Sequence, residues 1–144
     1  MRAVVQRVTQ ASVQVEGAEV AGIGAGLLVL VGVAHTDDAP NATALAHKIA
    51  WLRILRDGGR EDVSAASISA AALVVSQFTL YADTSSGRRP SWRAAAASAV
   101  ARPLVDQVAR ELAVRGLRVQ TGLFGATMSV SSVNDGPVTI LLEE

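Results

Sequence analysis

Two short polar segments hold the residues of this sequence that are best suited to chemistry. The first is Ser76-Gln77-Phe78-Thr79, and the second is Asn134-Asp135-Gly136-Pro137-Val138-Thr139. Hydroxyl, amide and backbone N–H groups can hold and orient a ligand through hydrogen bonds. A hydroxyl nucleophile would also need a base within hydrogen-bond reach, and neither histidine lies near this segment in the sequence.

The first segment follows an apolar run and lies at the carboxyl end of a predicted strand. In open α/β sheets, ligands bind at the carboxyl ends of strands. Alternation along a strand places Gln77 and Thr79 on one face and Ser76 and Phe78 on the other. All four can therefore meet one ligand only if the strand twists, bulges or ends there. The alternative is a strand end whose hydroxyl groups satisfy the local backbone.

The second segment also allows two interpretations. Asn-Asp-Gly-Pro is typical of turns, and a hairpin between strands at 126–133 and 138–142 would account for it. Alternatively, the segment is a rigid backbone device. Glycine lets the backbone approach a ligand with no side chain in between. A cis peptide bond between Gly136 and Pro137 would then fix the direction of the Gly136 carbonyl.

The hydrophobic pattern predicts the elements that must position these segments. Apolar runs with little polar interruption predict strands buried on both faces, and alternating runs predict half-buried strands. Asp37 or Asp38 with Pro40 can begin a helix, and Pro103 can begin another that Gly116 ends. We expect an α/β (α+β) fold, a single domain over 1–144 whose mixed sheet curls toward a barrel with two long helices. The predicted strands are 2–8, 12–16, 20–23, 27–33, 71–80, 117–121, 128–131 and 138–142; the helices are 39–56 and 103–115; and 60–70 is a loop.

Composition narrows the function. Thirteen basic and thirteen acidic residues give a net charge of zero, which argues against broad non-specific binding to nucleic acid. The chain has no cysteine, and His35 and His47 are not at metal-binding spacing, so we expect no metal and no cofactor. The longest apolar run, 27–33, is too short to span a membrane. We therefore expect a soluble, cytoplasmic protein.

Together the two segments resemble the paired signature motifs of the D-aminoacyl-tRNA deacylase family, of the D-Tyr-tRNA deacylase type. The resemblance covers nearly the whole chain and includes Gln6-Arg7-Val8 near the start and the glycine-rich entry to the run at 27–33. The chain departs from the family at Arg60-Glu61-Asp62, where Lys-Met-Asn is common, and at Leu123, where an arginine is common. Both departures concern the rim of a pocket and leave the paired motifs intact.

The resemblance implies a cytoplasmic homodimer that hydrolyses the ester between a D-amino acid and tRNA, and also glycyl-tRNA, in translation quality control. Ser76, Gln77, Phe78 and Thr79 would form one wall of a site at the dimer interface. Gly136 and Pro137 of the partner subunit, joined by a cis bond, would exclude L side chains and so perform chiral proofreading. The tRNA's terminal 2′-hydroxyl would help to activate water, and the backbone amides of Phe78 and Thr79 would stabilise the oxyanion.

Arginines supply the candidate contacts to tRNA. Arg88 and Arg89 follow the first segment closely, together with Trp92 and Arg93, and Arg7 is a further candidate. A solvated loop is the alternative for Arg88, Arg89 and Arg93. Two other functions stay open at this point: a catalytically silent RNA-binding module on the same fold, and a general esterase with Thr79 as its nucleophile.

Overall fold

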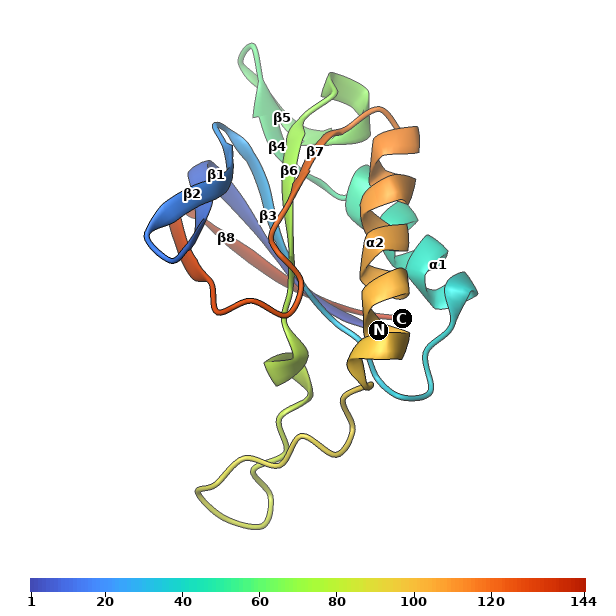
Figure 1. Cartoon of the computed structure of the whole chain (residues 1–144). Helices are drawn as coiled ribbons and strands as arrows, with labels where there is room; N and C mark the ends of the chain where they lie inside the picture. The colour runs from blue at the N-terminus through green and yellow to red at the C-terminus, as the bar shows by residue number, and fades with distance from the viewer.

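A computed structural model describes residues 1–144, in which a mixed sheet has two helices packed on one face (Figure 1). The two helices pack against one another, and each contributes buried apolar residues to the core beside the sheet. None of the helices is long and apolar enough to span a membrane. The elements are β1 Arg2–Val15, β2 Ala18–Ile23, β3 Gly26–Gly32, α1 Ala39–Trp51, β4 Arg53–Asp57, β5 Arg60–Ser64, a 3-10 helix Ala66–Ile68, β6 Ala71–Ser76, a 3-10 helix Phe78–Tyr81, α2 Ser98–Val114, β7 Arg118–Thr121 and β8 Ser129–Glu143.

The sheet has the strand order β2-β1-β3-β6-β7, and β8 pairs with the other edge of β1. Pairing is antiparallel around β1 and parallel from β3 to β6 and from β6 to β7. Because β2 also lies close to β6 and β7, the sheet is nearly closed into a barrel. The predicted fold class, a mixed sheet curled toward a barrel with two long helices, is confirmed.

The long first strand differs from its prediction as two strands. β1 runs without a break and changes its neighbour on one edge, from β3 along Arg2–Val8 to β2 along Ala11–Val15. Its opposite edge pairs with β8 over nearly its full length. β1 therefore belongs to both parts of the sheet: it pairs with β3 at one end and with β2, where the sheet curls toward a barrel, at the other.

Two hydrophobic cores explain why β3 and β6 are apolar throughout. The larger core lies between the sheet and the helices and includes Leu45 and Leu112, which are both fully buried. The smaller core fills the inside of the curled sheet and includes Leu28 and Leu73. Since β3 and β6 contribute side chains to both cores, both faces of these strands are buried, as predicted.

The first helix begins where the sequence predicts but ends earlier. Asp38 caps it in a capping box with Asn41, and Pro40 lies in its first turn. The prediction that the helix extends to 56 is wrong, because β4 pairs with β5 in a hairpin whose turn is Gly58-Gly59, with φ values of +54° and +83°. The predicted loop at 60–70 is wrong for the same reason.

The second helix begins five residues before its predicted start at Pro103. Ser98 is its first residue, so Pro103 lies inside the helix. The apolar positions that follow, including Val108 and Leu112, face the larger core as the helical spacing predicts.

Candidate active site

The first segment lies where the central strand β6 ends. Ser76 is the last residue of β6, and the Gln77 N–H still donates to the Val31 carbonyl at 2.7 Å. The chain then turns into the 3-10 helix of Phe78–Tyr81. Residues of both strand faces can meet one ligand here because the strand ends at Ser76. The Gln77 side-chain amide donates to the Thr79 hydroxyl.

A cavity of about 810 Å³ opens at this end of the sheet. Ser76, Gln77 and Phe78 line it, whereas Thr79 does not. A larger and more open hollow of about 1020 Å³ lies along α1 and contains no residue of either segment. The walls of the first cavity are mainly apolar and come from β3, β6, α2, the start of β8 and the segments beside these elements: Val31, Val33, Val75, Trp92, Arg93, Ala95, Ala96, Ala97, Ser98, Ala101, Val105, Phe124, Gly125, Ala126, Met128 and Val130.

The cavity contains one ionisable side chain, that of Arg93. Neither histidine lines it, and the His35 ring nitrogen instead contacts the Ala94 carbonyl at 3.2 Å on the surface. A hydroxyl nucleophile at this site would therefore have no imidazole or carboxylate partner to take its proton. What the cavity offers a substrate is a shaped apolar wall with hydroxyl, amide and backbone groups at one end.

Tyr81 and Asp83, at the exit from the 3-10 helix, have shifted pKa values. Burial raises the pKa of the Tyr81 phenol above its usual 10.0, and the nearby Asp37 carboxylate acts in the same direction. Hydrogen bonds from the Ser85 backbone and hydroxyl lower the pKa of the exposed Asp83 carboxyl. Neither group lines the cavity.

The second segment is a bulge and not a hairpin turn. The predicted hairpin between 126–133 and 138–142 is wrong, because both halves belong to β8 and pair with the same strand, β1. The pairing register shifts opposite Gln6–Gln10, and the residues around Gly136 stand out from the ladder. The Gly136–Pro137 peptide bond is cis.

Five side-chain contacts fasten this bulge to its surroundings. The Asn134 amide donates to the Arg7 and Val138 carbonyls, each at 2.9 Å, and so closes the bulge across its base. The Arg7 Nε lies 3.1 Å from the Asp135 carbonyl and 3.0 Å from its carboxylate. A further bond joins the Gln6 amide to the Thr139 hydroxyl at 3.0 Å.

Arg7 is buried beneath the bulge, with 7% of the residue exposed. Its Nη1 donates to the Ile54 carbonyl at 2.7 Å, so the residue also ties the bulge to the β4–β5 hairpin. A β-carbon added at Gly136 would lie 2.5 Å from the Arg7 Nη2. The expectation that Arg7 contacts tRNA does not fit this position, because its guanidinium faces protein groups and not solvent.

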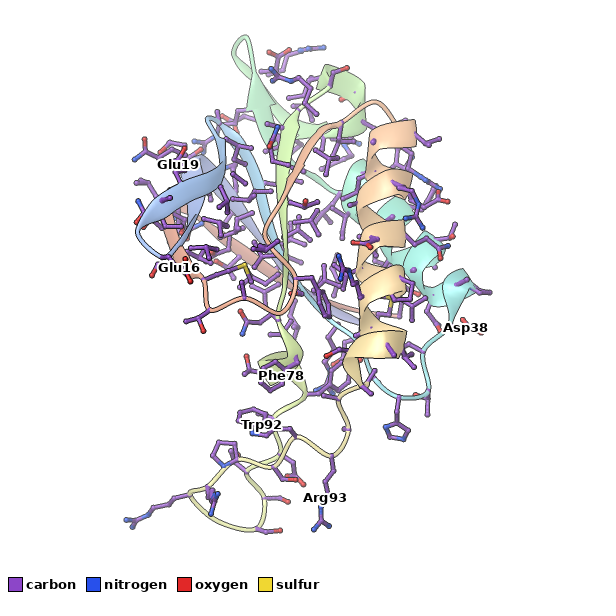
Figure 2. The ribbon with its side chains drawn as sticks, in the orientation of Figure 1. Glu16, Glu19, Asp38, Phe78, Trp92 and Arg93 are labelled. Atoms are coloured by element: carbon purple, nitrogen blue, oxygen red, sulfur yellow. The ribbon has the colours of Figure 1, made fainter.

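The structure therefore places the predicted site residues in three groups. Ser76, Gln77 and Phe78 share the cavity, while Gly136 and Pro137 stand on the bulge and do not line it. Arg88 and Arg89 are exposed on the long loop between the 3-10 helix and α2, which extends away from the body (Figures 1 and 2). Within one chain the two motifs are not brought together.

Two kinds of residue at the cavity and the bulge could not be identified from the sequence. Phe124 and Met128 form cavity walls, but isolated apolar residues between strands give no signal that separates a cavity from a core. In the sequence, Asn134 is only one residue of a turn-like segment. Its capacity to donate two hydrogen bonds is the signal that could have indicated a clamp.

Within this chain, a strand end faces an apolar cavity and a fastened Gly-Pro bulge stands elsewhere on the same sheet. The family model for D-Tyr-tRNA(Tyr) deacylase matches residues 4–143, and the chain belongs to this family. A D-aminoacyl-tRNA deacylase of Kineococcus radiotolerans is 59% identical, with 99% of both chains covered. One of Chloroflexus aurantiacus is 56% identical over 99% of this chain and 90% of the relative.

Two solved structures have a similar fold. The c-Myc DNA Unwinding Element Binding Protein superposes with a TM-score of 0.93 at 36% sequence identity, covering 100% of this chain and 99% of that one. A probable eukaryotic D-amino acid tRNA deacylase superposes with a TM-score of 0.85 at 17% identity, covering 98% and 97%. The second likeness shows that the fold is shared.

Proposed function

We propose that this protein hydrolyses the ester bond of D-aminoacyl-tRNA and releases the free D-amino acid and tRNA. The observation that carries the proposal is the Ser76-Gln77-Phe78 end of β6, which forms one end of a cavity with apolar walls. The curated relatives, at 55–59% identity over essentially the whole chain, are named for this activity. In this role the protein acts in chiral proofreading and translation quality control, in the cytoplasm, where charged tRNA is used.

The proposed chemistry needs no side-chain base. Water attacks the ester carbonyl, and the 2′-hydroxyl of the terminal ribose of the tRNA helps to activate that water. The tetrahedral intermediate then expels the ribose 3′-oxygen, which leaves with a proton. The backbone N–H groups of Phe78 and Thr79, in the turn after β6, stabilise the oxyanion, and Ser76 and Gln77 orient the ester.

Thr79 as a nucleophile is the competing mechanism. The Thr79 hydroxyl accepts a hydrogen bond from Gln77, which is not a base, and it does not line the cavity. Substitution Thr79→Ala separates the two mechanisms. Near-total loss of activity would support a nucleophilic threonine, whereas substrate-assisted hydrolysis retains a substantial part of the rate.

The proposed chiral filter is supplied by a second copy of the chain. Gly136 and Pro137 lie outside the cavity of their own chain, so they serve a site only in a partner. β8 pairs on one edge alone and carries exposed apolar side chains at Val130, Val133 and Leu141, which suit a subunit interface. There the Gly-Pro pair would collide with an L side chain but not with a D side chain or with glycine, so glycyl-tRNA is a further expected substrate.

Parallel release assays test the function. Purified protein at catalytic concentration is incubated with labelled D-Tyr-tRNA and L-Tyr-tRNA, and free amino acid is measured over time. We expect rapid loss of the D ester alone. Loss of both esters would contradict the chiral filter, and loss of neither would favour a catalytically silent RNA-binding module. Rapid hydrolysis of simple D-amino-acid esters without tRNA would favour a general esterase.

Sedimentation equilibrium tests the homodimer. At micromolar concentration we expect the mass of two chains of 14.9 kDa each. A mass corresponding to one chain would contradict a site shared between subunits.

A further inference from the structure

Two exposed aromatic rings stand together at the outer rim of the cavity. Phe78 and Trp92 pack edge to face, with ring centroids 5.3 Å apart and an interplanar angle of 74°. They remain 56% and 41% exposed, although each also lines the cavity. Figure 2 shows the two rings next to one another between the body and the tip of the long loop. A large aromatic surface left open beside a cavity indicates a binding surface.

The backbone holds Trp92 in this position. The Asp83 N–H donates to the Ser91 carbonyl at 2.9 Å, and the Ser91 N–H donates back to the Asp83 carbonyl at 2.8 Å. These two bonds close the neck of the loop directly before Trp92. The ring is therefore presented by a fixed neck, while the tip of the loop lies further out (Figure 2).

The same loop is basic. Arg88, Arg89 and Arg93 are all exposed, and none of them takes part in the ion pairs of the chain. Asp83 is the only acid between the 3-10 helix and α2, and its carboxylate accepts a hydrogen bond from the Ser85 N–H at 2.9 Å. Three unpaired arginines beside two open aromatic faces are complementary to phosphates and bases together.

We propose that Phe78 and Trp92 form a stacking site for a nucleobase of a single-stranded RNA end. The base belongs to the nucleotide that precedes the terminal nucleoside, and Arg88 and Arg89 contact phosphates further along the strand. The inference rests on the proposed function, since the aminoacylated terminal nucleoside occupies the cavity. The RNA strand then leaves the cavity past Trp92, because this ring lines the cavity and is also exposed at its rim.

Tryptophan fluorescence tests the stacking site without any activity measurement. The chain has two tryptophans, Trp92 and Trp51, and Trp51 is 53% exposed on α1 outside this cavity. In a Trp51→Phe variant only Trp92 emits, and the unacylated oligoribonucleotide 5′-ACCA-3′ is expected to quench it. In the matched Trp92→Phe variant only Trp51 emits, and the same oligonucleotide should leave its emission unchanged.

Two outcomes would overturn the proposal. One is unchanged Trp92 emission at oligonucleotide concentrations that inhibit the release of amino acid from D-Tyr-tRNA. The other is equal quenching of Trp51 and Trp92, which would show non-specific contact.

Kinetics with two substrates provide the second test. D-Tyr-tRNA contains the preceding nucleotide, and D-tyrosyl-adenosine lacks it. For Trp92→Ala, we expect the ratio of kcat/KM for the tRNA to kcat/KM for the adenosine ester to fall about tenfold, mainly through KM for the tRNA. Trp92→Phe should restore most of that ratio. An unchanged ratio would overturn the stacking site and leave Trp92 as a support for Phe78.

Failure of the stacking proposal and failure of the proposed deacylase function give different results. If the wild-type protein hydrolyses neither substrate, the deacylase proposal fails. The stacking site can still be tested, because Trp92 quenching is then compared with oligonucleotide binding measured by fluorescence anisotropy. The arginines are tested by salt dependence: the Arg88→Ala, Arg89→Ala double variant removes two phosphate contacts to a single strand and should lower the slope of log KM against log salt by about 1.4. Arg110→Ala, which removes an exposed arginine on α2, is the matched control and should leave the slope unchanged. Equal slopes for both variants would count against the phosphate contacts.

Discussion

The substitution Gly136→Ala tests how tightly the Gly-Pro bulge is fastened. Gly136 has φ +119°, a conformation that residues with side chains rarely adopt. The added β-carbon would lie 2.5 Å from the Arg7 Nη2 and 3.1 Å from the Val138 Cγ2. Arg7 cannot move aside freely, because its Nη1 and Nε are held by Ile54 and Asp135.

The expected cost has two parts. Backbone strain at this φ contributes about 1–3 kcal/mol. Displacing the Arg7 guanidinium weakens at least one hydrogen bond made by a charged group, which contributes about 1.5–3 kcal/mol. We therefore expect Gly136→Ala to reduce the free energy of unfolding by about 4 kcal/mol. For a chain of this size that corresponds to a fall in Tm of roughly 12 °C.

Gly17→Ala is the matched control. Gly17 also has a positive φ, +80°, but nothing lies within 4 Å of a β-carbon added there. Only backbone strain remains, at about 1–3 kcal/mol. Thermal and urea unfolding of both variants, at equal protein concentration, would measure the difference. If Gly136→Ala costs no more than Gly17→Ala, the bulge is not packed against Arg7 as described.

Three further predictions concern the bulge, the interface and pH. Asn134→Asp should destabilise more than Asn134→Ala in urea unfolding, because a carboxylate cannot donate to two carbonyls and repels them; equal losses would contradict the clamp. Val133→Asp on β8 should shift sedimentation toward the monomer, and an unchanged mass would place the interface elsewhere. Tyr81 is the only tyrosine, so absorbance at alkaline pH reports its ionisation alone. Because burial raises the pKa of Tyr81 in the folded protein above 10.0, the phenol should ionise at higher pH in the native protein than in urea. Its contribution to the free energy of unfolding should therefore be complete below pH 10 and decline above it. Coincident titration curves would refute the last point.

The sequence predicts correctly those elements whose pattern lies within one short stretch of chain. The strands β3 and β6 were found because residues buried on both faces leave a continuous apolar run. The start of α1 was found because Asp38 and Pro40 act within one turn. Its end was missed because Leu52 and Leu55 continue the helical spacing of Leu45 and Ile49, and the same residues also fit the extended chain that leads into the β4–β5 hairpin.

Non-local pairing accounts for the remaining errors. The residues on either side of Gly136 alternate as two strands would, and only the position of β1 shows that both halves pair with one neighbour. Arg7 carries no sign in the sequence that it is buried, since its burial depends on that same pairing. The end of β6 was predicted as a site from its polar residues, whereas cavity walls such as Phe124 depend on how distant segments meet.

Mixed dimers would show whether one site combines Ser76 of one subunit with the Gly-Pro bulge of the other. Ser76→Tyr would fill the cavity of its own chain, and Pro137→Trp would block the cavity of its partner. Each variant alone should be inactive on D-Tyr-tRNA. After the two are unfolded together and refolded, one site in each mixed dimer is intact, so about a quarter of wild-type activity should return. Activity of Pro137→Trp alone, or no recovery from a mixture shown to contain mixed dimers, would contradict the account.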